Sequence, residues 1–122
     1  MRKNILLIDK DPAVIDVITC ILEEDGYQVY IAKKPFDLLE VKTYKPTLIL
    51  LHNGLNNEGT MICQTIKSDS ESKEIPIIMS STRADLPEVA QNCGANAHIQ
   101  KPFDIDDFLT LIKTTINTAT KS

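Results

Sequence analysis

Five short apolar runs, separated by stretches with helical periodicity, constrain the fold of this chain more than any other feature of its sequence. The runs occupy residues 5–8, 29–32, 48–51, 77–79 and 97–99. Nearly continuous apolar runs of this length are typical of strands that are buried on both faces, as in a parallel sheet. Parallel strands need a crossover connection, which is usually a right-handed helix packed on the sheet. The sequence therefore predicts an α/β protein with a doubly wound, five-stranded parallel sheet and five helices.

The limits of the first and last helices are marked by capping residues. Asp11 is placed to cap the first helix, Pro12 suits its first turn, and Gly26 is expected to end it. Asp104 is the expected cap of the last helix, which carries a long apolar stripe. The middle helices, whose apolar stripes are thinner, are predicted at 35–43, 58–67 and 84–92.

Composition and charge restrict the class of protein. The 122 residues fit one domain, predicted to span 1–122 without an output domain, and a hydrophobic content of 43% suffices for a core on two faces. The net charge of -4 argues against general binding to nucleic acid or membranes. Three cysteines without CxxC spacing suggest neither a disulfide framework nor a zinc site. We expect a cytoplasmic protein with reduced thiols.

Charged and polar side chains follow four of the five predicted strands. They are Asp9, Lys10 and Asp11 after the first run, His52 after the third, Ser81 after the fourth and Lys101 after the fifth. In a doubly wound sheet, binding and chemistry gather where the strands end, at the carboxyl edge. We therefore expect these side chains to share one site.

Four segments of the chain carry a resemblance to a known family. IPIIMSS and GANAHIQKPF, around the fourth and fifth strands, are its strongest pieces, and LLIDKDP and KPTLILLHNGLNNEG match the first and third strands in register. Through these segments the chain resembles the CheY-like receiver domains of response regulators over essentially its whole length. The resemblance implies a flavodoxin-like (βα)5 fold and a role in two-component or phosphorelay signalling.

The resemblance also assigns expected roles to residues. In receiver domains, an aspartate at the end of the third strand takes a phosphoryl group from a histidine kinase. Two acids after the first strand hold magnesium, and a hydroxyl and a lysine bind the phosphoryl oxygens. Asp9 matches the first acid, Ser81 the hydroxyl and Lys101 the lysine. His98 stands at the position of an aromatic residue that moves with this hydroxyl on activation.

Two positions depart from the family pattern. Lys10 stands where the second acid belongs, and His52 stands where the phosphoacceptor belongs. A pocket of three acids and one lysine has a formal charge of -2, which attracts a hard dication. With Lys10, Lys101, Asp9 and a neutral His52 the charge becomes +1. We expect the magnesium site to be lost, with no other cofactor, and Asp11 to serve as a helix cap.

The leading hypothesis is a pseudo-receiver that acts by protein interaction and is not an enzyme. Its expected partners are a histidine kinase, a phosphotransfer protein or an effector, and it is expected to be a monomer or a weak homodimer through the face of the fourth and fifth helices. An alternative is that His52 accepts phosphate or binds a metal with Asp9 and Asp11. A flavin-binding protein is disfavoured, because the loop after the first strand lacks the glycines and hydroxyls that cradle a phosphate.

Overall fold

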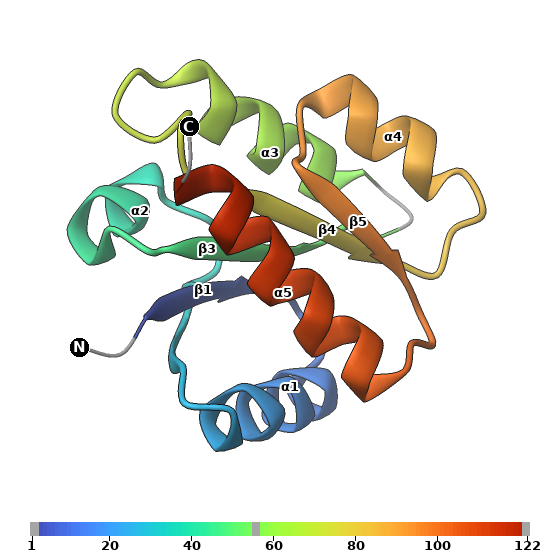
Figure 1. The fold of residues 1–122 in the computed structure, drawn as a ribbon. Helices are drawn as coiled ribbons and strands as arrows, with labels where there is room; N and C mark the ends of the chain where they lie inside the picture. Colours follow the sequence, from blue (N-terminus) through green and yellow to red (C-terminus); the bar gives the residue numbers. More distant parts are fainter. Residues whose placement is uncertain (1–2, 55–56, 121–122) are drawn as a thin grey trace.

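The five apolar runs form five parallel strands of a single sheet in the computed structural model, which describes residues 3–54 and 57–120 (Figure 1). The strand order is β2-β1-β3-β4-β5, so the sheet is doubly wound as predicted. The central strands are buried on both faces, and the edge strands β2 and β5 are more exposed. The strands are β1 (Asn4–Ile8), β2 (Gln28–Ile31), β3 (Leu48–His52), β4 (Ile77–Ser81) and β5 (Ala97–Gln100).

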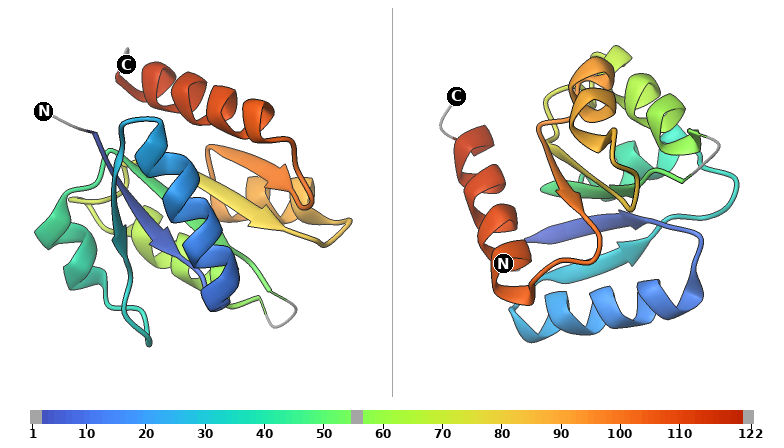
Figure 2. Two further views of the ribbon diagram at one scale, coloured as in Figure 1. Left: turned by 90° about the horizontal axis from the view of Figure 1, so that it is seen from below. Right: turned by 90° about the vertical axis from the view of Figure 1, so that its right-hand side faces the viewer.

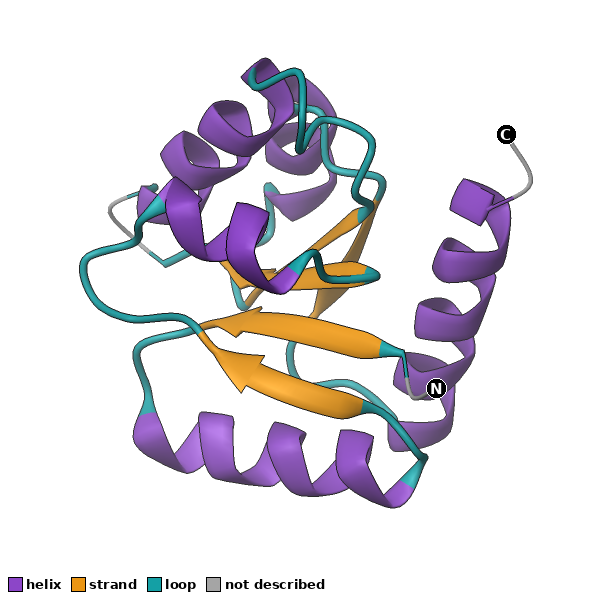
Figure 3. Cartoon of the chain, turned by 90° about the vertical axis from the view of Figure 1, so that its left-hand side faces the viewer, coloured by secondary structure: helices purple, strands orange, loops and turns teal. Residues whose placement is uncertain are grey.

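The helices cover both faces of the sheet (Figures 2 and 3). They are α1 (Pro12–Glu24), α2 (Leu38–Tyr44), α3 (Glu58–Ser68), α4 (Leu86–Cys93) and α5 (Ile105–Thr120). α1 and α5 pack on one face, where Leu22 and Phe108 are buried against the strands. α2, α3 and α4 pack on the other face, where Val41, Ile66 and Ala90 are buried. No helix in the described part of the chain is long and apolar enough to cross a membrane.

The predicted caps of the outer helices are confirmed. The Asp11 carboxylate accepts a hydrogen bond from the Ala13 amide at 3.0 Å, and Pro12 is the first residue of α1. Gly26 has φ of 94°, a left-handed conformation that glycine adopts without strain, directly after the helix. Asp104 accepts from two amides in the first turn of α5. These caps fix where the loops at the carboxyl edge enter both helices.

The predicted starts of two middle helices are wrong by two or three residues. α2 begins at Leu38 and not at residue 35, because the Asp37 side chain caps it by accepting a hydrogen bond from the Leu39 amide at 3.0 Å. α4 begins at Leu86 and not at residue 84, which places Pro87 in its first turn. α3 begins at Glu58 as predicted.

Two of the three cysteines pack in the core and the third, Cys20, is exposed on α1. All three are free thiols, and Cys63 and Cys93 are buried where α3 meets α4. The Cys63 thiol donates to the Cys93 carbonyl oxygen at 3.4 Å, and burial raises the pKa of this thiol to about 12. A thiol with so high a pKa is a poor nucleophile.

Gly59 lets α3 approach the end of β3 closely. A Cβ atom at this position would lie 2.7 Å from the His52 carbonyl oxygen and 2.8 Å from the Asn53 Cα, closer than real Cβ atoms come. Only glycine therefore fits at this contact without moving backbone. The contact brings the first turn of α3 to the carboxyl edge, beside the residues that follow β1.

Candidate functional site

An open pocket of about 950 Å³ lies at the carboxyl edge of the sheet, among the loops that follow β1, β2 and β3. Its polar wall contains four of the residues predicted to share a site, which are Asp9, Lys10, Asp11 and His52. Its other wall is apolar and includes Phe36, from the loop that follows β2. The strand ends thus bring these four residues together in the lining of one pocket.

Lys101 lies between Asp9 and His52. Its ammonium nitrogen is 3.4 Å from Asp9 Oδ2 and 3.3 Å from His52 Nδ1. The Asp9 side chain is only 3% exposed, and its other carboxylate oxygen accepts hydrogen bonds from the Lys10 and Asp11 amides at 2.7 and 3.1 Å. Both carboxylate oxygens of Asp9 are therefore engaged, one by a cation and one by backbone.

The Lys10 side chain pairs with Glu58, the first residue of α3. The Lys10 side chain is more than half exposed, so this ion pair contributes little to stability by itself. Lys34 donates to the Lys10 carbonyl oxygen at 2.8 Å from the loop after β2. The loop after β1 is thus held from two sides, by α3 and by residues 32–37.

Ser81 and His98 lie outside this pocket. Ser81 is buried at the end of β4, and its hydroxyl oxygen accepts a hydrogen bond from the Arg83 amide at 3.1 Å. His98 is exposed on β5, paired in register with Met79. The two residues predicted to act together as a switch therefore differ in their surroundings. The Ser81 hydroxyl oxygen is hydrogen-bonded within its own loop, and His98 is exposed to solvent.

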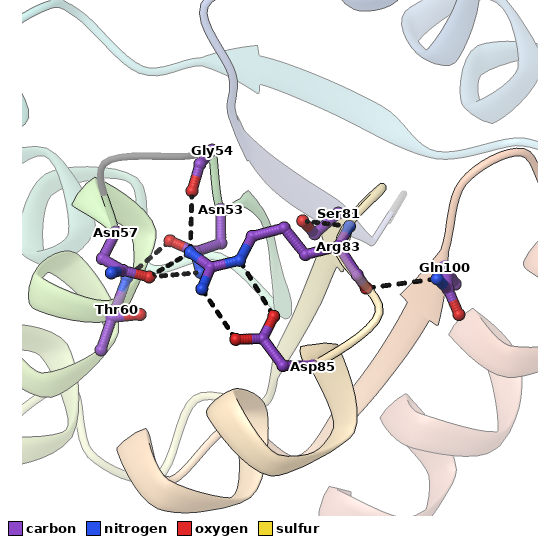
Figure 4. Close-up of polar contacts among 8 residues, drawn as sticks. All are labelled: Asn53, Gly54, Asn57, Thr60, Ser81, Arg83, Asp85 and Gln100. Carbon is purple, nitrogen blue, oxygen red and sulfur yellow. Dashed lines mark hydrogen bonds and ion pairs between the residues drawn. The ribbon is translucent and has the colours of Figure 1, made fainter.

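Sequence reasoning missed Arg83, which is at the centre of a polar cluster beside the pocket (Figure 4). It forms a two-pronged ion pair with Asp85 and also bonds to Gly54 and Asn57 in the loop after β3. The spacing of Arg83 and Asp85 could have indicated a local ion pair. The contact with Asn57 depends on how two loops meet in space, and the sequence carries no signal for it.

The environment of His52 lowers its pKa below the ordinary value. Burial of the ring is the main cause of the lowered pKa, and the neighbouring Lys101 ammonium adds to it, while Asp9 acts in the opposite direction. At neutral pH the ring is therefore uncharged and can accept a hydrogen bond from Lys101 at Nδ1. A charged imidazolium would lose this bond and face the ammonium directly.

The lowered pKa of His52 predicts a pH-dependent stability. Between the folded-state pKa and the unfolded value of about 6.5, the unfolded chain binds more protons, so stability rises with pH. We expect the contribution of His52 to be complete above this window and to be lost as the pH falls through it. Urea unfolding at a series of pH values checks this for the wild type and for His52→Gln, which should lack this dependence. The exposed His98→Gln is the matched control and should retain it, and equal pH profiles for all three proteins would contradict the prediction.

The comparison with known protein families agrees with this geometry. Residues 5–113 match the response regulator receiver domain family. The chain belongs to this family. Receiver domains are signalling modules of two-component systems, and the predicted membership of the receiver-domain family is confirmed.

Individual relatives support the same assignment. The chain is 31% identical over 115 residues to the DNA-binding dual master transcriptional regulator RpaA of Synechocystis, covering 90% of this chain and 47% of that protein. It is 26% identical to sporulation initiation phosphotransferase F of Bacillus subtilis, covering 93% of each. A CheY-like receiver domain from Methanospirillum hungatei superposes with a TM-score of 0.87 at 30% identity, covering 99% of this chain and 98% of that one. The chain thus spans about half the length of the DNA-binding relative and nearly all of the other two.

Proposed function

We propose that this receiver domain signals through protein contacts without being phosphorylated at the usual site. The observation that supports the proposal most is the position of Lys101, whose ammonium bridges His52 and Asp9. In a phosphorylatable receiver the lysine would meet a phosphoryl group on a carboxylate. Here no carboxylate stands at position 52, and the lysine already neutralises the one buried acid of the pocket.

The residues of the pocket do not fit a magnesium ion. Magnesium requires several oxygen ligands in near-octahedral geometry, usually from one or two carboxylates. The Asp9 carboxylate is taken up by Lys101 and by two backbone amides, and Asp11 is engaged as a helix cap. Among residues 3–54 and 57–120, no three His, Cys, Asp or Glu side chains are grouped so as to hold a metal ion. The formal charge of +1 on Asp9, Lys10, His52 and Lys101 also opposes a dication.

Partners of this module are proposed on the basis of its family. A histidine kinase or a phosphotransfer protein would bind it as a competitor of phosphorylatable receivers, and an effector would bind it as an output. Direct binding to DNA is not part of the proposal, because the net charge of the chain is -4. Self-association through α4, β5 and α5 would give at most a weak dimer.

Magnesium titration followed by amide NMR tests the proposal. We expect millimolar magnesium to leave the amide signals of Asp9, Lys10 and His52 unshifted in the wild-type chain, because the pocket offers no free pair of carboxylates. The matched variant Lys10→Asp/His52→Asp should show saturable shifts at the same amides. Saturable shifts in the wild type would overturn the loss of the metal site and favour the alternative in which His52, Asp9 and Asp11 bind a metal.

A further inference from the structure

The loop after β4 is tied to the loop after β3 by the Arg83 side chain (Figure 4). Its Nε and Nη2 atoms donate to the two carboxylate oxygens of Asp85 at 2.9 and 2.7 Å. Its Nη1 atom donates to the Gly54 carbonyl oxygen at 3.4 Å and to the side-chain oxygen of Asn57. One guanidinium therefore serves four acceptor atoms that belong to two different loops.

The contact with Asn57 continues into the buried end of β3. Asn57 has φ of 60° and directly precedes α3, and its side-chain oxygen also accepts from Asn53 Nδ2 at 3.5 Å. The Asn53 side chain is almost fully buried, and its oxygen accepts from the Thr60 amide at 3.2 Å. Through these two asparagines, the position of Arg83 is linked to the first turn of α3.

The backbone of Arg83 ties the same loop to β4 and β5. Its amide donates to the hydroxyl oxygen of Ser81 at 3.1 Å, and its carbonyl oxygen accepts from Gln100 Nε2 at 3.2 Å. The ends of three neighbouring strands, β3, β4 and β5, are thus joined through one residue (Figure 4). A surface ion pair between Arg83 and Asp85 alone would be worth little, but a planar guanidinium with several fixed acceptors is rigid.

We propose that Arg83 acts as a strap that holds Gly54 and Asn57, which follow β3, in a fixed position against the loop after β4, without a phosphoryl group. This inference rests on the proposed function, because a receiver that is not phosphorylated needs another means to fix these residues. The strap would keep the Ser81 hydroxyl engaged with its own loop. It would also give partners a constant surface around α4 and β5.

Amide hydrogen exchange measured by NMR tests the strap. In Arg83→Met, which keeps an unbranched apolar stem but removes the guanidinium, we expect exchange to accelerate by roughly tenfold at the amides that follow β3 and β4. The informative signals are those of the Asn57 and Thr60 amides, because these residues lie at the start of α3 and not in the loop that carries the substitution. Arg83→Lys should behave similarly, because an ammonium cannot serve both Asp85 and Asn57 with the same fork.

The control is Lys42→Met, which removes the ion pair of Lys42 with Asp69 at the C-terminal end of α3 and should leave exchange at these amides unchanged. Acceleration at Arg83 and Leu86 alone would overturn the inference, since Arg83 would then order only its own loop. Unchanged exchange at Asn57 and Thr60 in both Arg83 variants would overturn it as well. None of these measurements uses phosphate. The inference about Arg83 can therefore be refuted while the proposed function holds, and the proposed function can be refuted while the inference about Arg83 holds.

Discussion

The double variant Lys10→Asp/His52→Asp is expected to take up a phosphoryl group from acetyl phosphate in the presence of magnesium. The two substitutions supply the missing nucleophile and the missing second acid, and they change the formal charge of the pocket from +1 to -2. Lys101 would then be free to leave Asp9 and meet the phosphoryl oxygens. Intact-mass measurement over time gives the extent and the rate of modification.

The single variants separate the two defects. His52→Asp alone has a nucleophile but still lacks a metal acid, so we expect it to react at least about tenfold more slowly than the double variant. Lys10→Asp alone has no carboxylate at position 52 and should stay unmodified. A His52→Asp rate equal to that of the double variant would show that Lys10 is no obstacle, and modification of Lys10→Asp would place the acceptor elsewhere.

Lys101→Met is expected to lower the free energy of unfolding by about 3 kcal/mol, the largest loss of stability expected from a single change in this pocket. The Asp9 side chain is 3% exposed and that of Lys101 15% exposed, so removal of the lysine leaves a buried carboxylate without its cation. The substitution should also raise the pKa of His52 toward its ordinary value, because the neighbouring ammonium is one of the two causes that lower it most. Chemical unfolding and an NMR titration of the ring measure the two effects.

The matched control for Lys101→Met is Lys10→Met. Lys10 pairs with Glu58 at the surface, where both side chains are about half exposed, so its loss should cost less than about 1 kcal/mol. Equal free energies of unfolding for Lys101→Met and Lys10→Met would contradict the predicted loss of stability. A His52 pKa that is unchanged in Lys101→Met would contradict the predicted effect of the Lys101 ammonium on the ring.

Most of the fold could be predicted from the sequence because the apolar runs are short and alternate with helical stretches, and the three that form the central strands are almost entirely buried. The caps of α1 and α5 were also readable, since Asp11 and Asp104 directly precede long apolar stripes. The starts of α2 and α4 were not, because a proline is compatible with several positions near a helix start. Only the placement of Asp37 and of Pro87 in space decides where those helices begin.

The sequence was enough to predict which residues lie in the site, but not which of their side chains pair with each other. A parallel sheet brings its strand ends to one edge, so Asp9, His52 and Lys101 had to lie near one another. The sequence could not say that Lys101 would bridge the other two, or that Lys10 would turn to Glu58, because long flexible side chains reach several partners. These choices depend on the close approach of α3 to β3 and on the lengths of the loops.

Exposure of the wild-type chain to acetyl phosphate with magnesium, followed by intact-mass measurement and peptide mapping, shows whether position 52 accepts a phosphoryl group. We expect an unmodified wild-type chain beside a modified Lys10→Asp/His52→Asp control in the same experiment. A phosphoryl group mapped to His52 of the wild type would refute the proposed function and identify a phosphotransfer protein that uses a histidine acceptor.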